Sequence, residues 1–267
     1  MANLLLGKPV LEDIKSQLVS SNIQKKVTTV GFTYDQQWLQ YVNALKKNAP
    51  SFGVEVENIL LEEGDDIVAK IQQLNFDDQV GGIMVQQPLP KPVANAVETI
   101  AFEKDLDCLS SKAVNALYRN EKNAVCSATP QAVLELLNFY GISVAGKNVV
   151  IVGRGYAVGR PLALLLINNN ATVTVCHTKT IDLPKVCKTA DILISCCGVP
   201  NMIDERHVKD GMIVIDVGLS FVDGKTCGDV NASAIENIVE AYSPVPGGVG
   251  PVTRGCIFKN LQKLITK

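Results

Sequence analysis

The chain has 267 residues, of which 47% are hydrophobic, and a formal net charge of −2. This length allows one large or two modest domains, and the mixed charges leave no basic stripe of the kind that binds nucleic acid. No apolar run approaches membrane-spanning length, and the apolar stretch near the N-terminus is too short for a signal peptide. We therefore expect a cytoplasmic protein that binds neither nucleic acid nor membrane.

The eight cysteines are scattered through apolar surroundings, and two of them, Cys196 and Cys197, are adjacent. No C-x-x-C pair is present, and the only histidines are His177 and His207. This pattern is typical of buried, reduced thiols in a cytosolic protein. We expect neither a disulfide framework nor a metal site.

The first part of the chain alternates between strand and helix patterns. Strands are predicted at 27–31, 54–61 and 82–85. Apolar residues at helical spacing predict helices at 37–52, 65–74, 115–119 and 131–140. Alternation of this kind is typical of a parallel sheet that is covered by helices.

The same alternation resumes in the second part of the chain. Strands are predicted at 148–152, 171–176, 191–195 and 212–217, and a last helix at 253–267. We therefore expect two α/β domains flanking a cleft. Residues 1–120 would form the first domain, to which the helix at 253–267 returns, and residues 121–252 would form a Rossmann-type dinucleotide-binding domain.

A glycine turn links the strand at 148–152 to an apolar helix pattern. It reads Gly153-Arg154-Gly155-Tyr156-Ala157-Val158-Gly159, with the spacing G-x-G-x-x-x-G and not the commoner G-x-G-x-x-G. Between strand and helix, such a turn lets backbone N–H groups approach a phosphate, which the helix dipole also attracts. Glycine turns occur here without a ligand as well, so the surroundings decide whether Gly153, Arg154, Gly155 and Gly159 bind a nucleotide.

The end of the next strand indicates which nucleotide would bind. In a dinucleotide fold this end faces the adenosine ribose, where an Asp or Glu binds the 2′-hydroxyl of NAD. Here His177 and Thr178 follow the strand, and the first acid is Asp182. A site with several donors and no carboxylate favours the 2′-phosphate of NADP over NAD. The alternative is an ordinary solvated strand end.

Four motifs, in order along the chain, resemble those of the bifunctional methylenetetrahydrofolate dehydrogenase/cyclohydrolase family. Val85-Gln86-Gln87-Pro88-Leu89-Pro90 is similar to its V-Q-L-P-L-P loop, and residues 103–108 are similar to its P-E-K-D-V-D-G segment. Residues 152–161 are similar to V-G-R-S-x-x-V-G-x-P, and residues 246–253 to P-G-G-V-G-P-M-T. The resemblance covers nearly the whole chain.

The resemblance implies two reactions in one cleft of a homodimer. A hydride passes from 5,10-methylenetetrahydrofolate to NADP, and the methenyl product is then hydrolysed. Asp107 would hold the pterin ring, Gln86 would support the catalytic centre, and Tyr41 would stack near the folate. The resemblance places further substrate contacts at Pro246, Gly247 and Gly248, and cofactor phosphate contacts at Arg154 and His177.

Each of the three central side chains also has a purely structural alternative. Asp107 would then be an exposed loop carboxylate. Gln86 would be a turn residue before a proline, and Tyr41 would be a core aromatic on a helix. The place of Asp107 within Lys104-Asp105-Leu106-Asp107 favours a role in binding.

The sequence departs from the family at the catalytic lysine. The family pattern Y-V-x-x-K-x-K has this lysine four residues after the tyrosine, where this chain has Leu45. Residues i and i+4 share a helix face, whereas Lys46 and Lys47 are rotated from Leu45 by about 100° and 200°. The loop at 32–36 is also about two residues longer than the family's. If the extra length is placed after Tyr41, Asn43 takes the lysine position.

The loss of this lysine has unequal consequences for the two reactions. Hydrolysis needs a group that moves protons, which typically supplies about 10²–10⁴ in rate, whereas hydride transfer depends mainly on proximity and orientation. We therefore expect a dehydrogenase whose cyclohydrolase activity is lost or weak. Other departures, Gly155 for serine and Cys108 for glycine, leave open a different substrate or a non-catalytic nucleotide-binding protein. Asp107 and Gln86, which are retained, favour the dehydrogenase.

Overall fold

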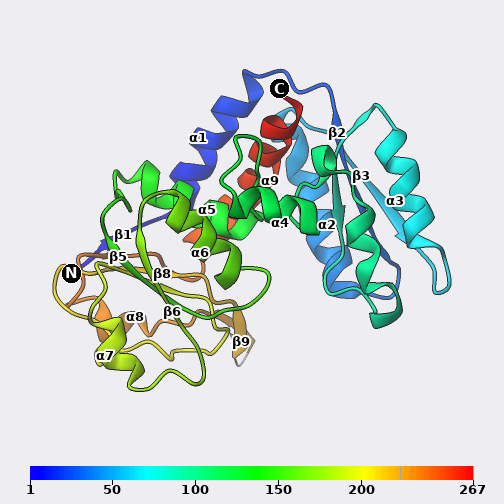
Figure 1. Ribbon diagram of the computed structural model, residues 1–267. Helices are drawn as coiled ribbons and strands as arrows, with labels where there is room; N and C mark the ends of the chain where they lie inside the picture. The colour runs from blue at the N-terminus through cyan, green and yellow to red at the C-terminus, as the bar shows by residue number, and fades with distance from the viewer. Residues whose placement is uncertain (223, 267) are drawn as a thin grey trace. The chain divides into compact units, whose positions relative to one another are not determined.

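The computed structural model describes residues 1–222 and 224–266, which form two compact units (Figure 1). Asp13–Ser127 and the residues from Arg254 onward form one of them, here called the β2–β4 unit. Met1–Glu12 and Ala128–Thr253 form the other, the β5–β8 unit. The division differs from the expected ranges because the N-terminal strand joins the sheet of the β5–β8 unit.

A three-stranded parallel sheet, in the order β3-β2-β4, forms the centre of the β2–β4 unit. Its strands are β2 (Lys26–Phe32), β3 (Val56–Leu61) and β4 (Val80–Val85). The chain crosses from β2 to β3 through α2 (Gln36–Asn48) and from β3 to β4 through α3 (Ile67–Phe76). Because both crossovers are expected to be right-handed and run in opposite directions along the sheet, they put α2 and α3 on opposite faces.

The remaining elements of this unit are short, apart from the two helices that continue into it from the other unit. They are η1 (Ala49–Phe52), η2 (Lys91–Thr99), η3 (Phe102–Lys104), α4 (Ser111–Tyr118) and the greater parts of α1 (Gly7–Val19) and α9 (Val249–Ile265). On the α3 side of the sheet, Val30 and Ile83 pack with Ile71. Phe52 contacts Phe258 of α9, with ring centroids 4.7 Å apart. Apolar contacts thus join α3 to the sheet, and η1 to α9.

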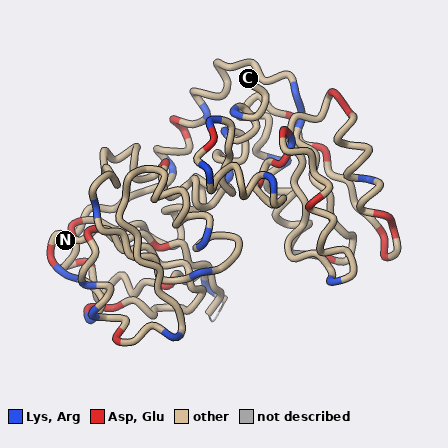
Figure 2. Tube along the Cα trace, in the orientation of Figure 1, with Lys and Arg blue, Asp and Glu red and all other residues tan. Residues whose placement is uncertain are grey.

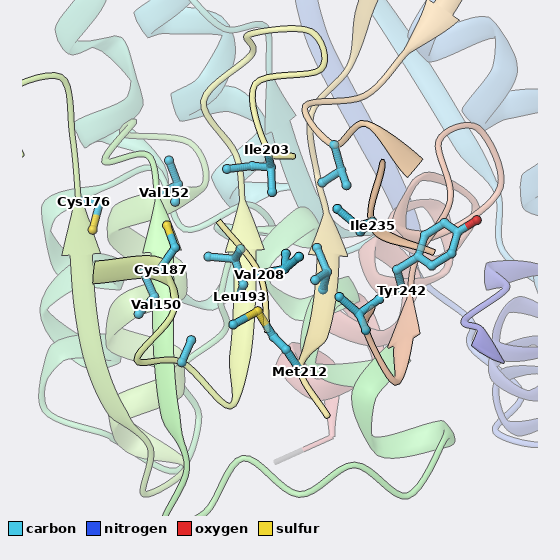
Figure 3. Packing of buried hydrophobic residues seen from close by; sticks show 14 residues of the cluster. Val150, Val152, Cys176, Cys187, Leu193, Ile203, Val208, Met212, Ile235 and Tyr242 are labelled. Atoms are coloured by element: carbon cyan, nitrogen blue, oxygen red, sulfur yellow. The ribbon is translucent and has the colours of Figure 1, made fainter. Parts of the chain in front are cut away.

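The β5–β8 unit is built on a six-stranded sheet in the order β1-β11-β8-β7-β5-β6, in which every pairing is parallel. The strands are β5 (Asn148–Val152), β6 (Thr172–Cys176), β7 (Ile192–Ser195), β8 (Ile213–Asp216) and the two-residue strands β1 (Asn3–Leu4) and β11 (Ala241–Tyr242). Figure 3 shows the core on one face of this sheet, where Val150, Leu193 and Met212 lie among apolar neighbours.

Helices α5 (Ala128–Phe139), α6 (Gly159–Asn168), α7 (Leu183–Cys187) and α8 (Ala232–Ile235) complete this unit. Strands β9 (Ser220–Val222) and β10 (Lys225–Cys227) form a separate antiparallel pair. The structure confirms two α/β units with parallel sheets, the second of which has the strand–turn–helix order of a Rossmann-type domain.

All five predicted helices differ from the structure at their ends, and three of them differ by four residues at one end. The helix predicted at 37–52 was wrong in its last turn, because α2 ends at Asn48 and a 3-10 helix that contains Pro50 follows. The last helix begins at Val249 and not at 253, since a first helical turn tolerates Pro251. The helix predicted at 115–119 begins at Ser111, because Ser110 caps it.

In the described part of the chain, charged residues of both signs are mixed and the cysteines are free. Lysine and arginine are interspersed with aspartate and glutamate on both units (Figure 2). All eight cysteines are free, and five of them are buried. In residues 1–222 and 224–266 no helix is long and apolar enough to cross a bilayer. Over the same residues, no three His, Cys, Asp or Glu side chains are grouped as metal ligands would be.

Candidate active site

Gln86 directly follows β4 and is held by β2 and by the loop after it. Its backbone N–H donates to the Val30 carbonyl (2.9 Å), which extends the pairing of the two strands. Its side-chain Oε1 accepts from the Phe32 N–H (2.8 Å), and its Nε2 donates to Oδ2 of Asp35 (2.7 Å). Gln86 is only 3% exposed. It is therefore an ordered, buried amide at the carboxyl edge of the sheet and not a solvated turn residue.

Asp105 and Asp107 have different environments although they are two residues apart. Asp105 is fully buried and accepts from the Leu109 N–H (3.0 Å), the Ser110 N–H (2.7 Å) and the Ser110 hydroxyl (2.6 Å). Burial raises the pKa of Asp105, and these hydrogen bonds oppose the rise. Asp107 is half-buried. Asp105 thus anchors the turn into α4, whereas Asp107 is the less buried of the two carboxylates.

The turn after Asp107 has an unusual backbone. Cys108 has a φ of +56°, in the left-handed region that favours glycine. The family motif has glycine at this position, so the backbone conformation of the motif is kept while its residue has changed. Cys108 is 6% exposed, and burial is the main cause that raises the pKa of its thiol above its usual range. A protonated, buried thiol is a packing group and not a nucleophile.

Tyr41 lies on α2 near Asp107. Burial raises the pKa of Tyr41, the negative charge of Asp107 raises it further, and the positive charge of Arg254 opposes the rise. The ring stacks with that of Trp38 at a centroid distance of 6.0 Å. Tyr41 is nevertheless 37% exposed, so it is not a core aromatic. The structure therefore brings Tyr41, Asp107 and Arg254 into one electrostatic neighbourhood of the β2–β4 unit.

Leu45 follows Tyr41 by one helical turn and is 1% exposed. The neighbouring lysines, Lys46 and Lys47, are exposed, and so is Asn43. None of these three side chains shares the buried position of Leu45. The helix therefore has an apolar side chain one turn after Tyr41, and no adjacent residue of α2 takes its place.

The glycine turn begins where β5 ends. Gly153 has a φ of +129°, and a Cβ on it would lie 2.6 Å from the Cys196 carbonyl oxygen. A Cβ on Gly159 would lie 2.3 Å from the Gly153 carbonyl oxygen. At these two positions the protein's own backbone leaves no room for a side chain. Gly155, in contrast, has no atom within 4 Å of where a Cβ would stand, so its side-chain position is open space.

The ends of β5 and β6 are neighbours, because the Gly153 N–H donates to the Cys176 carbonyl (3.0 Å). The His177 N–H donates to the Thr180 hydroxyl (2.8 Å), and the His177 Nδ1 accepts from the Lys179 N–H (3.1 Å). A neutral ring that accepts at Nδ1 carries its proton on Nε2. Arg154, Thr178 and Lys179 are exposed beside this loop. The backbone bond therefore places the residues that follow β5 and those that follow β6 at the same edge of the sheet.

A second polar cluster at the same edge of the sheet was missed by the sequence analysis. Oδ2 of Asp229 accepts from the Ser195 hydroxyl (2.9 Å) and the Cys197 N–H (2.8 Å). Asp216 accepts from the N–H groups of Gly218 (2.9 Å) and Asp229 (3.0 Å). Burial raises the pKa of Asp216 to about 6, and the nearby charge of Asp229 contributes to the rise. The signal in the sequence was an acid at the end of an apolar strand, Asp216 in Ile213–Asp216.

The predicted substrate residues Pro246, Gly247 and Gly248 belong to the β5–β8 unit, where they form a turn before α9. The Gly248 N–H donates to the Pro244 carbonyl (2.7 Å), and the Gly7 N–H donates to the Gly247 carbonyl (2.8 Å). A Cβ on Gly7 would lie 1.9 Å from the Gly248 carbonyl oxygen. The Leu6-Gly7 segment and this turn therefore fix one another.

Comparison with known proteins also divides the chain into two parts. The family model "Tetrahydrofolate dehydrogenase/cyclohydrolase, catalytic domain" matches residues 5–107, and "Tetrahydrofolate dehydrogenase/cyclohydrolase, NAD(P)-binding domain" matches residues 127–267. The "Bifunctional protein FolD" of Clostridium perfringens (strain SM101 / Type A) is 42% identical over 275 residues, which cover 98% of this chain and 99% of that protein.

Solved structures agree with this result. The bifunctional FolD methylenetetrahydrofolate dehydrogenase/cyclohydrolase of Campylobacter jejuni has a TM-score of 0.93 and 34% identity, covering 99% of both chains. The FolD enzyme of Trypanosoma brucei, solved with NADP cofactor and inhibitor, has a TM-score of 0.89 and 32% identity, covering 98% of this chain and 97% of that one. The chain is therefore an NAD(P)-dependent member of the tetrahydrofolate dehydrogenase/cyclohydrolase family.

Proposed function

We propose that this chain is a methylenetetrahydrofolate dehydrogenase that uses NADP and whose cyclohydrolase activity is lost or weak. The observation that carries the proposal is the buried Leu45 one helical turn after Tyr41, with Lys46 and Lys47 exposed. Attack of water on the methenyl carbon requires proton transfer, and leucine has no titratable atom. Hydride transfer needs no such group on the protein.

The β2–β4 unit supplies the proposed folate contacts. A half-buried carboxylate at Asp107 suits the polar edge of a pterin, which offers N–H donors to an acceptor. Tyr41 offers an exposed aromatic face for stacking. Gln86 offers a buried amide whose orientation is fixed by two hydrogen bonds. We assign these three residues to binding and orienting the folate, which is the main requirement for hydride transfer.

The β5–β8 unit supplies the proposed nucleotide contacts. The glycine turn from Gly153 to Gly159 leads into a ten-residue helix, α6, whose N-terminus attracts a phosphate. The open space at Gly155 leaves the backbone there accessible to a ligand. Arg154, His177 and Thr178 supply donors for a 2′-phosphate, and each charge-assisted bond is worth roughly 1.5–3 kcal/mol. The NADP-bound relative supports the same cofactor.

Bound NADP would supply the chemistry by accepting the hydride that leaves the folate methylene carbon. Removal of a hydride leaves a positive charge on the N–CH–N group of the product. The carboxylate of Asp107 is in the unit that we assign to the folate and stabilises positive charge. The chain's residues thus bind and orient the folate, while hydrolysis of the cationic product lacks its proton-transfer group.

A homodimer is the assembly that we propose for this chain. The support is the family resemblance, together with two exposed apolar side chains at β9, Leu219 (66% exposed) and Phe221 (76% exposed). Exposed apolar side chains on a two-stranded antiparallel pair are a suitable surface for a second copy. Pro246, Gly247 and Gly248 of the β5–β8 unit are the further substrate contacts that we propose on the family resemblance.

The proposed activity is tested by supplying 5,10-methylenetetrahydrofolate with NADP and with NAD. Reduced nucleotide and the folate product are then measured in the same reaction. We expect reduction of NADP in preference to NAD, and a product that accumulates as methenyltetrahydrofolate. Purified protein that reduces neither nucleotide would exclude a dehydrogenase.

A further inference from the structure

Asp35 lies in the loop between β2 and α2 and holds the Gln86 side chain. The Asp35 N–H donates to the Phe32 carbonyl (3.3 Å), which closes a turn directly after the strand. Through this turn the Phe32 N–H and the Asp35 carboxylate both reach the same amide, at 2.8 Å and 2.7 Å. The Gln86 amide is thus held by one donor, the Phe32 N–H, and one acceptor, the Asp35 carboxylate, which are three residues apart.

These two hydrogen bonds fix the orientation of the Gln86 side-chain amide. Oε1 must face the Phe32 N–H, and Nε2 must face the Asp35 carboxylate. Rotating the amide by half a turn would set a donor against a donor and an acceptor against an acceptor, which is costly for a side chain that is 3% exposed. Nε2 carries a second N–H that the bond to Asp35 does not use.

The two carboxylate oxygens of Asp35 have separate tasks. Oδ1 accepts from the Trp38 N–H (2.9 Å) and caps α2, while Oδ2 accepts from Gln86. Asp66 caps α3 in the same way, since its Oδ1 accepts from the Ala69 N–H (3.0 Å). The structure shows no glutamine bonded to Asp66 among the described residues. Capping alone therefore does not account for the second oxygen of Asp35.

We propose that Asp35 is a positioning residue of the dehydrogenase, which acts through Gln86. It holds the amide in the one orientation in which Gln86 can donate its second N–H to the folate. The inference rests on the proposed function, which assigns the folate to this unit. It also gives a task to the loop at 32–36, which carries Asp35 to a residue 51 positions away in the sequence.

A double-mutant cycle tests this coupling in the intact protein. Asp35→Ser keeps an oxygen for the helix cap but is too short to reach Gln86. Gln86→Met keeps the length of the side chain without its amide. With methylenetetrahydrofolate and saturating NADP, we expect each single variant to lower kcat/KM for the folate by about 10- to 100-fold. The double variant should be no worse than Gln86→Met alone, because Asp35 acts only through the amide.

Two further variants separate positioning from a structural role. Asp66→Ser is the matched cap control and should leave kcat/KM and the affinity for NADP unchanged. The exchange of Asp35→Asn with Gln86→Glu retains all three bonds, because the amide introduced at position 35 would donate to the carboxylate introduced at position 86 while its oxygen still caps α2. We expect Asp35→Asn alone and Gln86→Glu alone to lower the Tm, and the exchanged protein to recover it. It should not recover kcat/KM, since a carboxylate has no N–H for the folate.

Each outcome decides between the alternatives. Multiplicative losses in the double variant would show that Asp35 does not act through Gln86 and would overturn the inference. Recovery of kcat/KM together with Tm in the exchanged protein would show that the pair is only structural, with the same consequence. Wild-type protein without dehydrogenase turnover would instead remove the proposed function and the inference with it.

Discussion

Leu45 differs from the family's lysine in more than its charge. It is 1% exposed, so the position one turn after Tyr41 belongs to the core of the β2–β4 unit. A lysine in such surroundings would have a lowered pKa, and a nearby carboxylate such as Asp107 would have to compensate its charge. The residue therefore removes a proton carrier and also releases its neighbours from the need to balance a buried cation.

Arg154 gives the most direct prediction for a single residue of the nucleotide site. Replacing Arg154 by Ala should weaken NADP binding by about 5- to 20-fold, since the exposed guanidinium makes one charge-assisted contact that solvent partly screens. Binding of NAD, which lacks the 2′-phosphate, should change by less than about 2-fold. Calorimetric titration of both nucleotides measures the difference. Lys188→Ala, which removes an exposed charge of the same unit, is the control, and equal losses for both nucleotides would contradict the assignment.

Among the elements, β5 and the turn after it were the most predictable. An unbroken apolar run followed by Gly153 gave the strand at 148–152 with its observed ends. Local pattern was sufficient here because both faces of the strand are buried and the glycine is required by its own backbone conformation. The assignments of Tyr41, Gln86 and Asp107 also rest on short motifs, and they stay predictions.

Contacts between distant elements were not predictable from such patterns. The bond between Asp35 and Gln86 joins residues 51 positions apart, and Asp229 reaches Ser195 across 34 positions. The two-residue strands β1 and β11 were also missed, because such short strands show no periodicity. These features depend on tertiary structure, and the sequence contains no local signal for them.

The carboxyl end of β8 gives a prediction on pH dependence. Burial raises the pKa of Asp216 from 3.8 to about 6, so the native state binds its proton more tightly than the unfolded chain does. The resulting stability is complete below about pH 4 and is lost as the pH rises through 6. At about 1.4 kcal/mol per pKa unit, the loss is about 3 kcal/mol.

Urea unfolding between pH 4 and 7 measures this effect as a difference between proteins. Asp216→Asn should lower the free energy of unfolding overall, because its amide faces backbone N–H donors, and should remove the contribution that falls with rising pH. Asp210→Asn, at an exposed position, should keep the wild-type dependence. If the wild type and Asp216→Asn change in parallel over this range, Asp216 does not carry the effect.

For the whole molecule, the proposed dimer can be tested at β9. Phe221→Glu places a charge on an exposed apolar position and should convert a dimer into monomers in light scattering at micromolar concentration. Phe76→Glu is the matched control, because Phe76 is 89% exposed but lies in the β2–β4 unit. A wild-type protein that is already monomeric, or a dimer that survives Phe221→Glu, would contradict this surface.

The central claim for the whole molecule is that the two activities of the family are separated in this chain. The most direct test supplies methenyltetrahydrofolate without nucleotide and follows its absorbance with wild-type protein, with Leu45→Lys, with Leu45→Met and in buffer. We predict that the wild type and Leu45→Met hydrolyse it no faster than buffer, and that Leu45→Lys restores part of the hydrolysis. Hydrolysis by the wild-type protein well above the rate in buffer, at a dehydrogenase-competent concentration, would contradict the account.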